Sequence, residues 1–341
     1  MVKPHSPFKV NAKVNTDSPS NQNSSNSSPN PNDDPVDQEV KLDEKEWYYD
    51  MSGRKYLFIL NQKTFEDTTY FDELPSTRFG TDCDVKRLKD VFSSLNYKVV
   101  TVNNPNYIAI FDILKGIASL EHKHTSCICM AILTHGGRGG LLYAADRPYN
   151  FRLVEGIFGH LSCLANVPKV FFVQACRGRS LDAGHIGLVP DQRDRNLSTP
   201  NSKKSCRSDI CFDEVVPIMK AFNNGWTYNA HMRDCSYYNF LKGFAMDSIA
   251  RNPFDNPSGY VPTYADILVL YSTVENFVSY RFSDGTWMIQ ALCDNIEEYH
   301  KDHDIDFIMT MTKQKVARLI TDEATKQMPE VRSTLRKLLK L

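Results

Sequence analysis

The chain lacks the features that would insert it into a membrane, export it or attract it to nucleic acid by charge. None of its apolar runs approaches the ~18 residues that a membrane-spanning helix requires, and its amino terminus has no signal-peptide pattern. The formal net charge is −1, which gives no global field for an anionic membrane or a nucleic acid. We therefore expect a cytoplasmic protein with neither of these partners.

The sequence also lacks the regular, even set of cysteines of a disulfide-stabilised domain. It has nine cysteines at irregular spacings, and reduced thiols explain this better than a disulfide framework. The segment from His122 to Cys129 holds metal-ligand residue types close together. Its cysteines follow a strand pattern, however, and no second cluster completes a zinc site. We expect no metal and no cofactor.

Residues 1–45 are rich in Ser, Asn, Pro and Asp and have almost no aromatic side chains. Such a segment cannot bury enough apolar surface to offset the entropy that is lost on ordering. We predict a disordered leader over 1–45, with ordered structure beginning near Trp47.

Beyond the leader, strand-like apolar runs alternate with amphipathic, helix-like patterns. The predicted strands are 55–61, 98–102, 127–134, 170–175 and one within 260–273. The predicted helices are 82–95 (N-cap Asp82), 107–120, one that begins after the N-cap Asn150, one that begins near 285, and 305–320. Near the end of the chain, Val331, Leu335, Leu338 and Leu339 have a spacing that favours a further helix. The alternation implies right-handed crossovers and a largely parallel sheet, so the fold class is α/β.

Two of the predicted strands end in residues that could carry chemistry. The run from Val170 to Val173 leads into Cys176, and the run from Cys127 leads into His135. Ligands bind at the carboxyl ends of parallel strands, and a thiol needs a base to become a good nucleophile at neutral pH. A single cysteine after an apolar run is most often a buried structural thiol. The pairing of both runs favours a catalytic thiol and its base.

The residues around Cys176 are Gln-Ala-Cys-Arg-Gly, and this segment resembles the signature of the caspases. His135 lies 41 residues upstream, near the roughly 50 that is typical of that family. The resemblance implies a caspase-like fold, with a mostly parallel six-stranded sheet flanked by helices. It further implies that the tail from Lys326 to Glu330 leads into a last strand, which pairs across the two-fold axis of a dimer, where the apolar spacing favours a helix. It also implies that Cys176 is the nucleophile, that His135 is the base and later the acid, and that the backbone N–H groups of Gly136 and Cys176 form an oxyanion hole.

The resemblance further implies a cysteine endopeptidase that cleaves after aspartate. The positions that match the family's substrate pocket are Arg78, Gln174, Ser279, Tyr280 and Arg281. Arginine suits a carboxylate because its planar fork bonds both oxygens and stays charged when buried. Tyr280 stands where many caspases have Trp, and Phe282 stands where a small polar residue is frequent. The preferred tetrapeptide therefore stays open.

By the same resemblance the chain divides into four parts. These are a short prodomain (1–45), a large catalytic subunit (46–194) with His135 and Cys176, an activation linker with an aromatic-rich insertion (195–255), and a small subunit (256–341). The expected cleavage sites are Asp37, Asp194 and Asp247, each in a segment where an exposed backbone suits proteolysis. The short prodomain resembles that of an executioner caspase in apoptosis, which is made as a zymogen.

The partners implied are protein substrates with Asp at the cut site, a second copy in a homodimer of large and small subunit pairs, an upstream initiator caspase and inhibitor proteins. An alternative function is a catalytically silent caspase-like regulator of another protease. That alternative predicts a lost Cys, His or pocket arginine, whereas all are present here. Metacaspases share the His-Gly and Cys pair but prefer basic substrates, and the two arginines argue against them.

Overall fold

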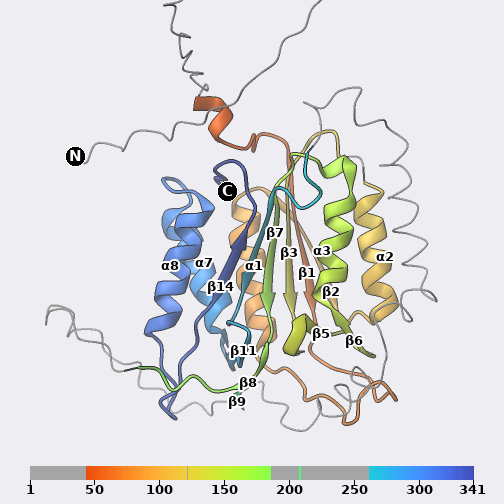
Figure 1. Cartoon of the computed structure of the whole chain (residues 1–341), viewed down its shortest axis with the longest axis vertical. Helices are drawn as coiled ribbons and strands as arrows, with labels where there is room; N and C mark the ends of the chain where they lie inside the picture. The colour runs from red at the N-terminus through yellow and green to blue at the C-terminus, as the bar shows by residue number, and fades with distance from the viewer. Residues whose placement is uncertain (1–43, 121, 186–206, 209–260) are drawn as a thin grey trace, which may run out of the picture. The chain divides into compact units, whose positions relative to one another are not determined.

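The computed structural model describes residues 44–120, 122–185, 207–208 and 261–341 (Figure 1). Nearly all of the predicted leader and most of the predicted linker lie outside these residues. So do the three predicted cleavage sites Asp37, Asp194 and Asp247. The predicted boundaries between prodomain, subunits and linker therefore stay predictions.

A six-stranded sheet forms the centre of the described structure, in the order β14-β10-β7-β3-β1-β2. Its strands are β1 (Arg54–Asn61), β2 (Tyr97–Asn103), β3 (Thr125–Leu133), β7 (Lys169–Gln174), β10 (Ile267–Tyr271) and β14 (Glu330–Ser333). Neighbours from β2 to β10 are parallel, and β14 alone runs antiparallel to β10. The structure confirms the mostly parallel six-stranded sheet.

Helices cover both faces of this sheet (Figure 1). On one face lie α1 (Thr81–Ser94), α7 (Trp287–Tyr299) and α8 (Ile305–Arg318), and on the other lie α2 (Tyr107–Ala118) and α3 (Phe151–His160). In β1, Leu57 and Ile59 belong to the first core, while Phe58 belongs to the second. Burial on both faces explains why the central strands are continuous apolar runs. None of the helices in the described part is long and apolar enough to cross a membrane.

Short strands in separate small sheets lie beyond the carboxyl ends of the parallel strands (Figure 1). After β3 come β4 (Gly136–Gly137), the 3-10 turn η2 (Arg138–Gly140), β5 (Leu141–Tyr143) and β6 (Pro148–Asn150). After β7, β8 (Gly178–Ser180) pairs with β11 (Asn276–Phe277). A small sheet joins β12 (Tyr280–Phe282), β13 (Gly285–Thr286) and β9 (Arg207–Ser208), the last being a described piece of the predicted linker. Two further short 3-10 helices of the described residues are η1 (Glu44–Trp47) and η3 (Ser162–Leu164).

The two predicted N-caps have different outcomes. The Asn150 side chain accepts a hydrogen bond from the Arg152 N–H at 2.9 Å, which confirms it as the cap of α3. Asp82 is not the cap of α1, because the cap is Gly80, two residues earlier, whose φ is 89°. A Cβ on Gly80 would lie 2.0 Å from the Phe282 carbonyl oxygen. This close approach requires glycine, and its backbone sets the helix start.

The predicted carboxyl-terminal helix is wrong. Residues Glu330–Ser333 form β14, in which Val331 is opposite Leu270 of β10. Leu339 is fully buried in the core although the chain that carries it is not helical. The open edge of β10 offers backbone hydrogen bonds to a further strand, and the local spacing of apolar residues does not encode this partner. The family resemblance, which implied a strand here, was the better guide.

Candidate active site

The ends of β3 and β7 bring His135 and Cys176 to the same edge of the sheet. The two strands are parallel neighbours, and Leu133 pairs with Gln174 in their register. The Thr134 N–H then donates to the Gln174 carbonyl at 3.0 Å. His135 and Cys176 each stand two residues beyond this last pair. The structure therefore places the predicted base and nucleophile at corresponding positions of adjacent strands.

His135 is oriented by a backbone carbonyl that the sequence did not point to. Its Nε2 lies 2.8 Å from the Ser76 carbonyl oxygen, and its ring stacks on Phe65 at 5.1 Å between centroids. A carbonyl can only accept, so Nε2 carries the proton and Nδ1 carries the lone pair. The imidazole is 2% exposed, which keeps bulk water away from this nitrogen. Ser76 belongs to an irregular loop with no motif, so no sequence signal could have identified it.

The Cys176 thiol packs against the backbone of Ser279. The Ser279 N–H donates to Sγ at 3.3 Å, and the Ser279 carbonyl oxygen lies 3.7 Å from Sγ. Donation of an N–H to sulfur stabilises the thiolate relative to the thiol. Gln174 lies beside this pair, because its Nε2 donates to the Ser279 Oγ at 2.7 Å. Two predicted site residues, Cys176 and Gln174, thus contact a third, Ser279.

The two predicted pocket arginines are buried, not solvated. Arg78 is 0% and Arg281 5% exposed. The Arg78 Nη1 donates to the Gln62 carbonyl at 2.8 Å and to the Thr81 Oγ1 at 3.1 Å. The Arg281 Nε donates to the Phe79 carbonyl at 2.8 Å. Because Phe79 directly follows Arg78, this bond ties the two arginines to one segment.

A buried carboxyl group accompanies these arginines. Asp84 accepts hydrogen bonds from the Thr286 N–H at 2.9 Å and from the Gln290 Nε2 at 2.8 Å. Burial raises the pKa of Asp84 to about 6, although these bonds and the charge of Arg78 act in the opposite direction. No sequence pattern singled out Asp84, because an acidic residue in the first turn of a helix is common.

Aromatic side chains form a wall beside the thiol. Cys176, Val278 and Tyr280 share one apolar cluster. The Tyr280 ring is 1% exposed, lies 5.2 Å from the Trp287 ring, and its hydroxyl donates to the Thr325 Oγ1 at 2.6 Å. The Phe282 ring stacks on Trp287 at 5.4 Å. Tyr280 and Phe282, the two departures from the family's common pattern, thus pack against the same tryptophan.

Arg177 connects the segment after Cys176 to several other elements. Its guanidinium lies 4.2 Å above the Tyr271 ring and donates to the Thr273 carbonyl at 3.2 Å. It also pairs with Glu275 at 2.6 Å and with Glu330. In the sequence, Arg177 stands out only as part of the Gln-Ala-Cys-Arg-Gly signature. Its contacts could not be predicted, because each of its partners comes from a distant part of the chain.

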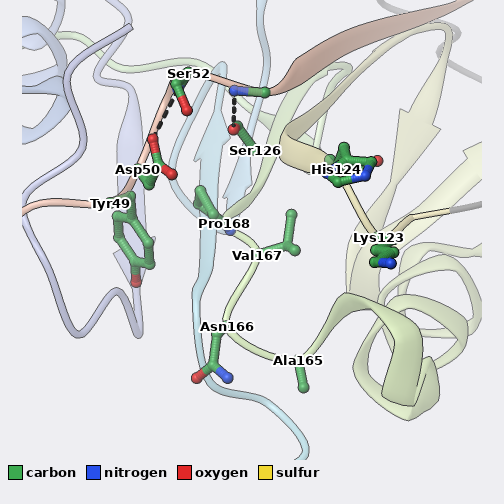
Figure 2. A pocket seen from close by; sticks show the side chains of 12 residues that line it. Tyr49, Asp50, Ser52, Lys123, His124, Ser126, Ala165, Asn166, Val167 and Pro168 are labelled. Atoms are coloured by element: carbon green, nitrogen blue, oxygen red, sulfur yellow. Dashed lines mark hydrogen bonds between the residues drawn. The ribbon is translucent and has the colours of Figure 1, made fainter.

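A hollow at the other end of the sheet lies away from these residues (Figure 2). It is formed where the chain enters β1, β3 and β7, so it lies at the amino ends of these strands, whereas His135 and Cys176 follow the carboxyl ends. The Gly53 N–H donates to the Ser126 Oγ at 2.7 Å across it (Figure 2). The residues that line it are Tyr49, Asp50, Ser52, Gly53, Lys123, His124, Thr125, Ser126, Ala165, Asn166, Val167 and Pro168.

The nearby cluster of metal-ligand residue types is used for packing and hydrogen bonds. His122 Nε2 lies 2.7 Å from the Ile117 carbonyl oxygen, and the Cys127 and Cys129 sulfurs lie 3.8 Å apart inside β3. Among the described residues, no three His, Cys, Asp or Glu side chains gather as a metal site would require.

Comparison with known proteins identifies the family. The family model of the caspase domain matches residues 54–340. Mouse caspase-8 is 29% identical over 315 residues, which cover 89% of this chain and 54% of that protein. Caspase-3 of Xenopus laevis is 28% identical over 82% of this chain and 77% of that protein. Among solved structures, caspase-1 from Spodoptera frugiperda has a TM-score of 0.62 at 25% identity, over 87% of this chain and 94% of that one.

The fold and the matched domain are those of the caspase-type cysteine peptidases. The chain belongs to the caspase family, since the family model spans almost all of the described structure. The chain spans about half the length of mouse caspase-8.

Proposed function

We propose that the protein is a cysteine endopeptidase that hydrolyses peptide bonds after aspartate. The observation that carries this proposal is the placement of His135 and Cys176 at the ends of adjacent parallel strands. There they contact Ser76 and Ser279, each of which lies two residues before a buried arginine. Arginine suits a carboxylate ligand because its planar guanidinium can bond both carboxylate oxygens and stays charged when buried.

In the proposed reaction the Nδ1 of His135 removes the proton of the Cys176 thiol. The thiolate attacks the carbonyl carbon of the scissile bond, and the N–H groups of Gly136 and Cys176 hold the resulting oxyanion. When the tetrahedral species collapses, the C–N bond breaks and His135 gives the proton to the leaving amine. Water then attacks the thioester with His135 as base, releasing the carboxylic acid and the thiol. The Ser76 carbonyl holds the imidazole in the tautomer that these reaction steps need.

Recognition of aspartate is assigned to Arg78, Arg281 and the amide of Gln174. Each arginine already uses part of its guanidinium to bond a backbone carbonyl, which fixes the direction of the planar fork. Ser279 and Tyr280 hold the strand that carries Arg281, and the side chain of Tyr280 contributes to an apolar wall for the residues before the aspartate.

We also propose that the protein is an executioner-type enzyme of apoptosis, made as a zymogen in the cytoplasm. Cleavage at Asp37, Asp194 and Asp247, by an upstream initiator caspase or by the enzyme itself, would separate large and small subunits. In support, both predicted subunits contribute strands to the one sheet, so a cut in the linker leaves β7 and β10 paired. A homodimer of subunit pairs and control by inhibitor proteins belong to the same proposal.

The experiment compares fluorogenic tetrapeptide amides that end in Asp or in Asn. We expect the Asn peptide to lose about 100-fold or more in kcat/KM, because a neutral amide cannot bond the two guanidinium groups through two charged oxygens as a carboxylate does. The Cys176→Ala variant should be inactive, whereas Cys163→Ala removes an exposed thiol and serves as the matched control. Turnover by Cys176→Ala, or equal cleavage of both peptides, would contradict the proposed function.

A further inference from the structure

We propose that Glu275 is a positioning residue that fixes the His135 loop relative to the segment after Cys176. This inference rests on the proposed peptidase function and adds a residue that neither the motif nor the arginine pocket contains. Glu275 follows β10 and directly precedes β11. It therefore comes from the predicted small subunit, whereas His135 and Cys176 both come from the predicted large one.

The carboxylate of Glu275 contacts both catalytic segments at once. Its Oε1 accepts a hydrogen bond from the Gly139 N–H at 2.9 Å. Its Oε2 lies 2.6 Å from the Arg177 Nη2. Gly139 is four residues after His135, and Arg177 directly follows Cys176. One side chain thus joins the loop of the base to the segment of the nucleophile.

The Arg177 end of this link is held firmly. The Arg177 N–H donates to the Phe277 carbonyl at 3.0 Å, and its own carbonyl accepts from the Asn276 N–H at 3.0 Å. Its guanidinium is further held by Tyr271, Thr273 and Glu330. Because these partners fix the position of Arg177, the ion pair with Arg177 fixes the Glu275 carboxylate. The other carboxylate oxygen then sets the position of Gly139.

The Gly139 end of the link lies in a tight turn. Gly139 has a φ of 70°, within the short turn η2. Its carbonyl accepts from the Asn150 Nδ2 at 2.7 Å, so Asn150 and Glu275 hold the residue from two sides. The turn continues directly from His135 and Gly136, and a shift in it would move the imidazole relative to the thiol. Misplacement of reacting groups by about 1 Å can cost about 100-fold in rate.

The contribution of Glu275 should appear in the rate and not in stability. Its side chain is 41% exposed, and an ion pair so close to solvent adds little to folding. A matched control is Glu297, which is 50% exposed and pairs with Arg87 between two helices. Glu275→Ala and Glu297→Ala therefore remove the same chemical group from comparable surroundings, one inside and one outside the proposed link.

The full-length wild type, Glu275→Ala, Glu275→Gln and Glu297→Ala are compared in two assays. The first measures kcat and KM on the aspartyl peptide. The second measures the pH profile of Cys176 alkylation by iodoacetamide, followed on the Cys176-containing peptide by mass spectrometry. The second assay needs no aspartate pocket, so it still tests Glu275 if the wild type fails to cleave aspartyl peptides.

We expect Glu275→Ala to lower kcat about tenfold or more with little change in KM, and to shift the alkylation profile to higher pH. Glu275→Gln should recover part of the loss, since its amide oxygen can still accept from Gly139. Glu297→Ala should match the wild type. An alkylation profile for Glu275→Ala that coincides with that of Glu297→Ala would overturn the proposal, as would a change in KM alone or a Gln variant no better than Ala.

Discussion

A Cβ atom on Gly136 would lie 2.4 Å from the carbonyl oxygen of Cys176. The same atom would lie 2.9 Å from the Ala175 Cβ and from the Leu141 carbonyl oxygen. The loop that follows His135 therefore contacts the backbone of the nucleophile segment so closely that only glycine fits. Because two of these neighbours are backbone atoms, they cannot yield without moving a strand end.

The first prediction follows from this contact. Gly136→Ala should lower kcat/KM by about 100-fold or more, because the added methyl separates His135 from Cys176. Gly116→Ala is the matched control, since a Cβ at Gly116 meets nothing within 4 Å and alanine favours the helix. Steady-state kinetics of both variants give the answer. Wild-type activity in Gly136→Ala would show that the contact is not needed.

A second prediction concerns the aspartate pocket. Arg281→Lys keeps the charge but loses the planar fork and the Nε that bonds the Phe79 carbonyl. We expect kcat/KM for the aspartyl peptide to fall by at least tenfold, or about 1.4 kcal/mol. Arg87→Lys, which alters an ion-paired arginine on α1, is the control. A smaller loss than this would remove Arg281 from the pocket.

A third prediction concerns the pH dependence of stability. Asp84 has a raised pKa of about 6 against an ordinary 3.8, so the folded state binds its proton more tightly than the unfolded state does. The stability that this proton gives is present below pH 3.8 and is lost as the pH rises to about 6, a change of about 3 kcal/mol.

Asp84→Asn should remove this dependence while its amide oxygen keeps the bond from the Thr286 N–H. The stability of the variant relative to the wild type should therefore rise from pH 4 to pH 6, because the two pKa values of about 3.8 and 6 bound the window in which Asp84 titrates. Urea unfolding at both pH values measures the difference, and Asp90→Asn, on the exposed side of α1, is the control. A difference that is constant with pH would show that Asp84 does not titrate in this window.

A fourth prediction concerns activation. Purified wild-type protein should process itself to fragments that begin at Gln38 and at Arg195 or Ser248, because these follow the proposed sites Asp37, Asp194 and Asp247. A chain with Asp194 and Asp247 both changed to Ala should stay uncut in the linker and be weakly active. Intact-mass analysis reads the products, and Cys176→Ala controls for contaminating proteases. Full activity of an uncut chain would contradict the zymogen proposal.

Local patterns in the sequence determined much of the framework. The apolar runs predicted the central strands, because a strand buried on both faces needs apolar side chains at every position. The periodic stripe of α1 and the cap at Asn150 predicted helices that the structure confirms. The signature around Cys176 and the His-Gly pair at His135 marked the two strand ends, since these motifs are contiguous in the chain.

Tertiary structure alone decided how those pieces meet. The Ser76 carbonyl that orients His135 is a backbone atom, and every residue has one, so the sequence carries no mark of it. The segment at Val331 forms the strand β14 because it pairs with the edge of β10, although its apolar spacing favours a helix. The junction of Glu275 with Gly139 and Arg177 joins residues more than 90 positions apart. Such contacts depend on the register and packing of whole strands, which no local periodicity encodes.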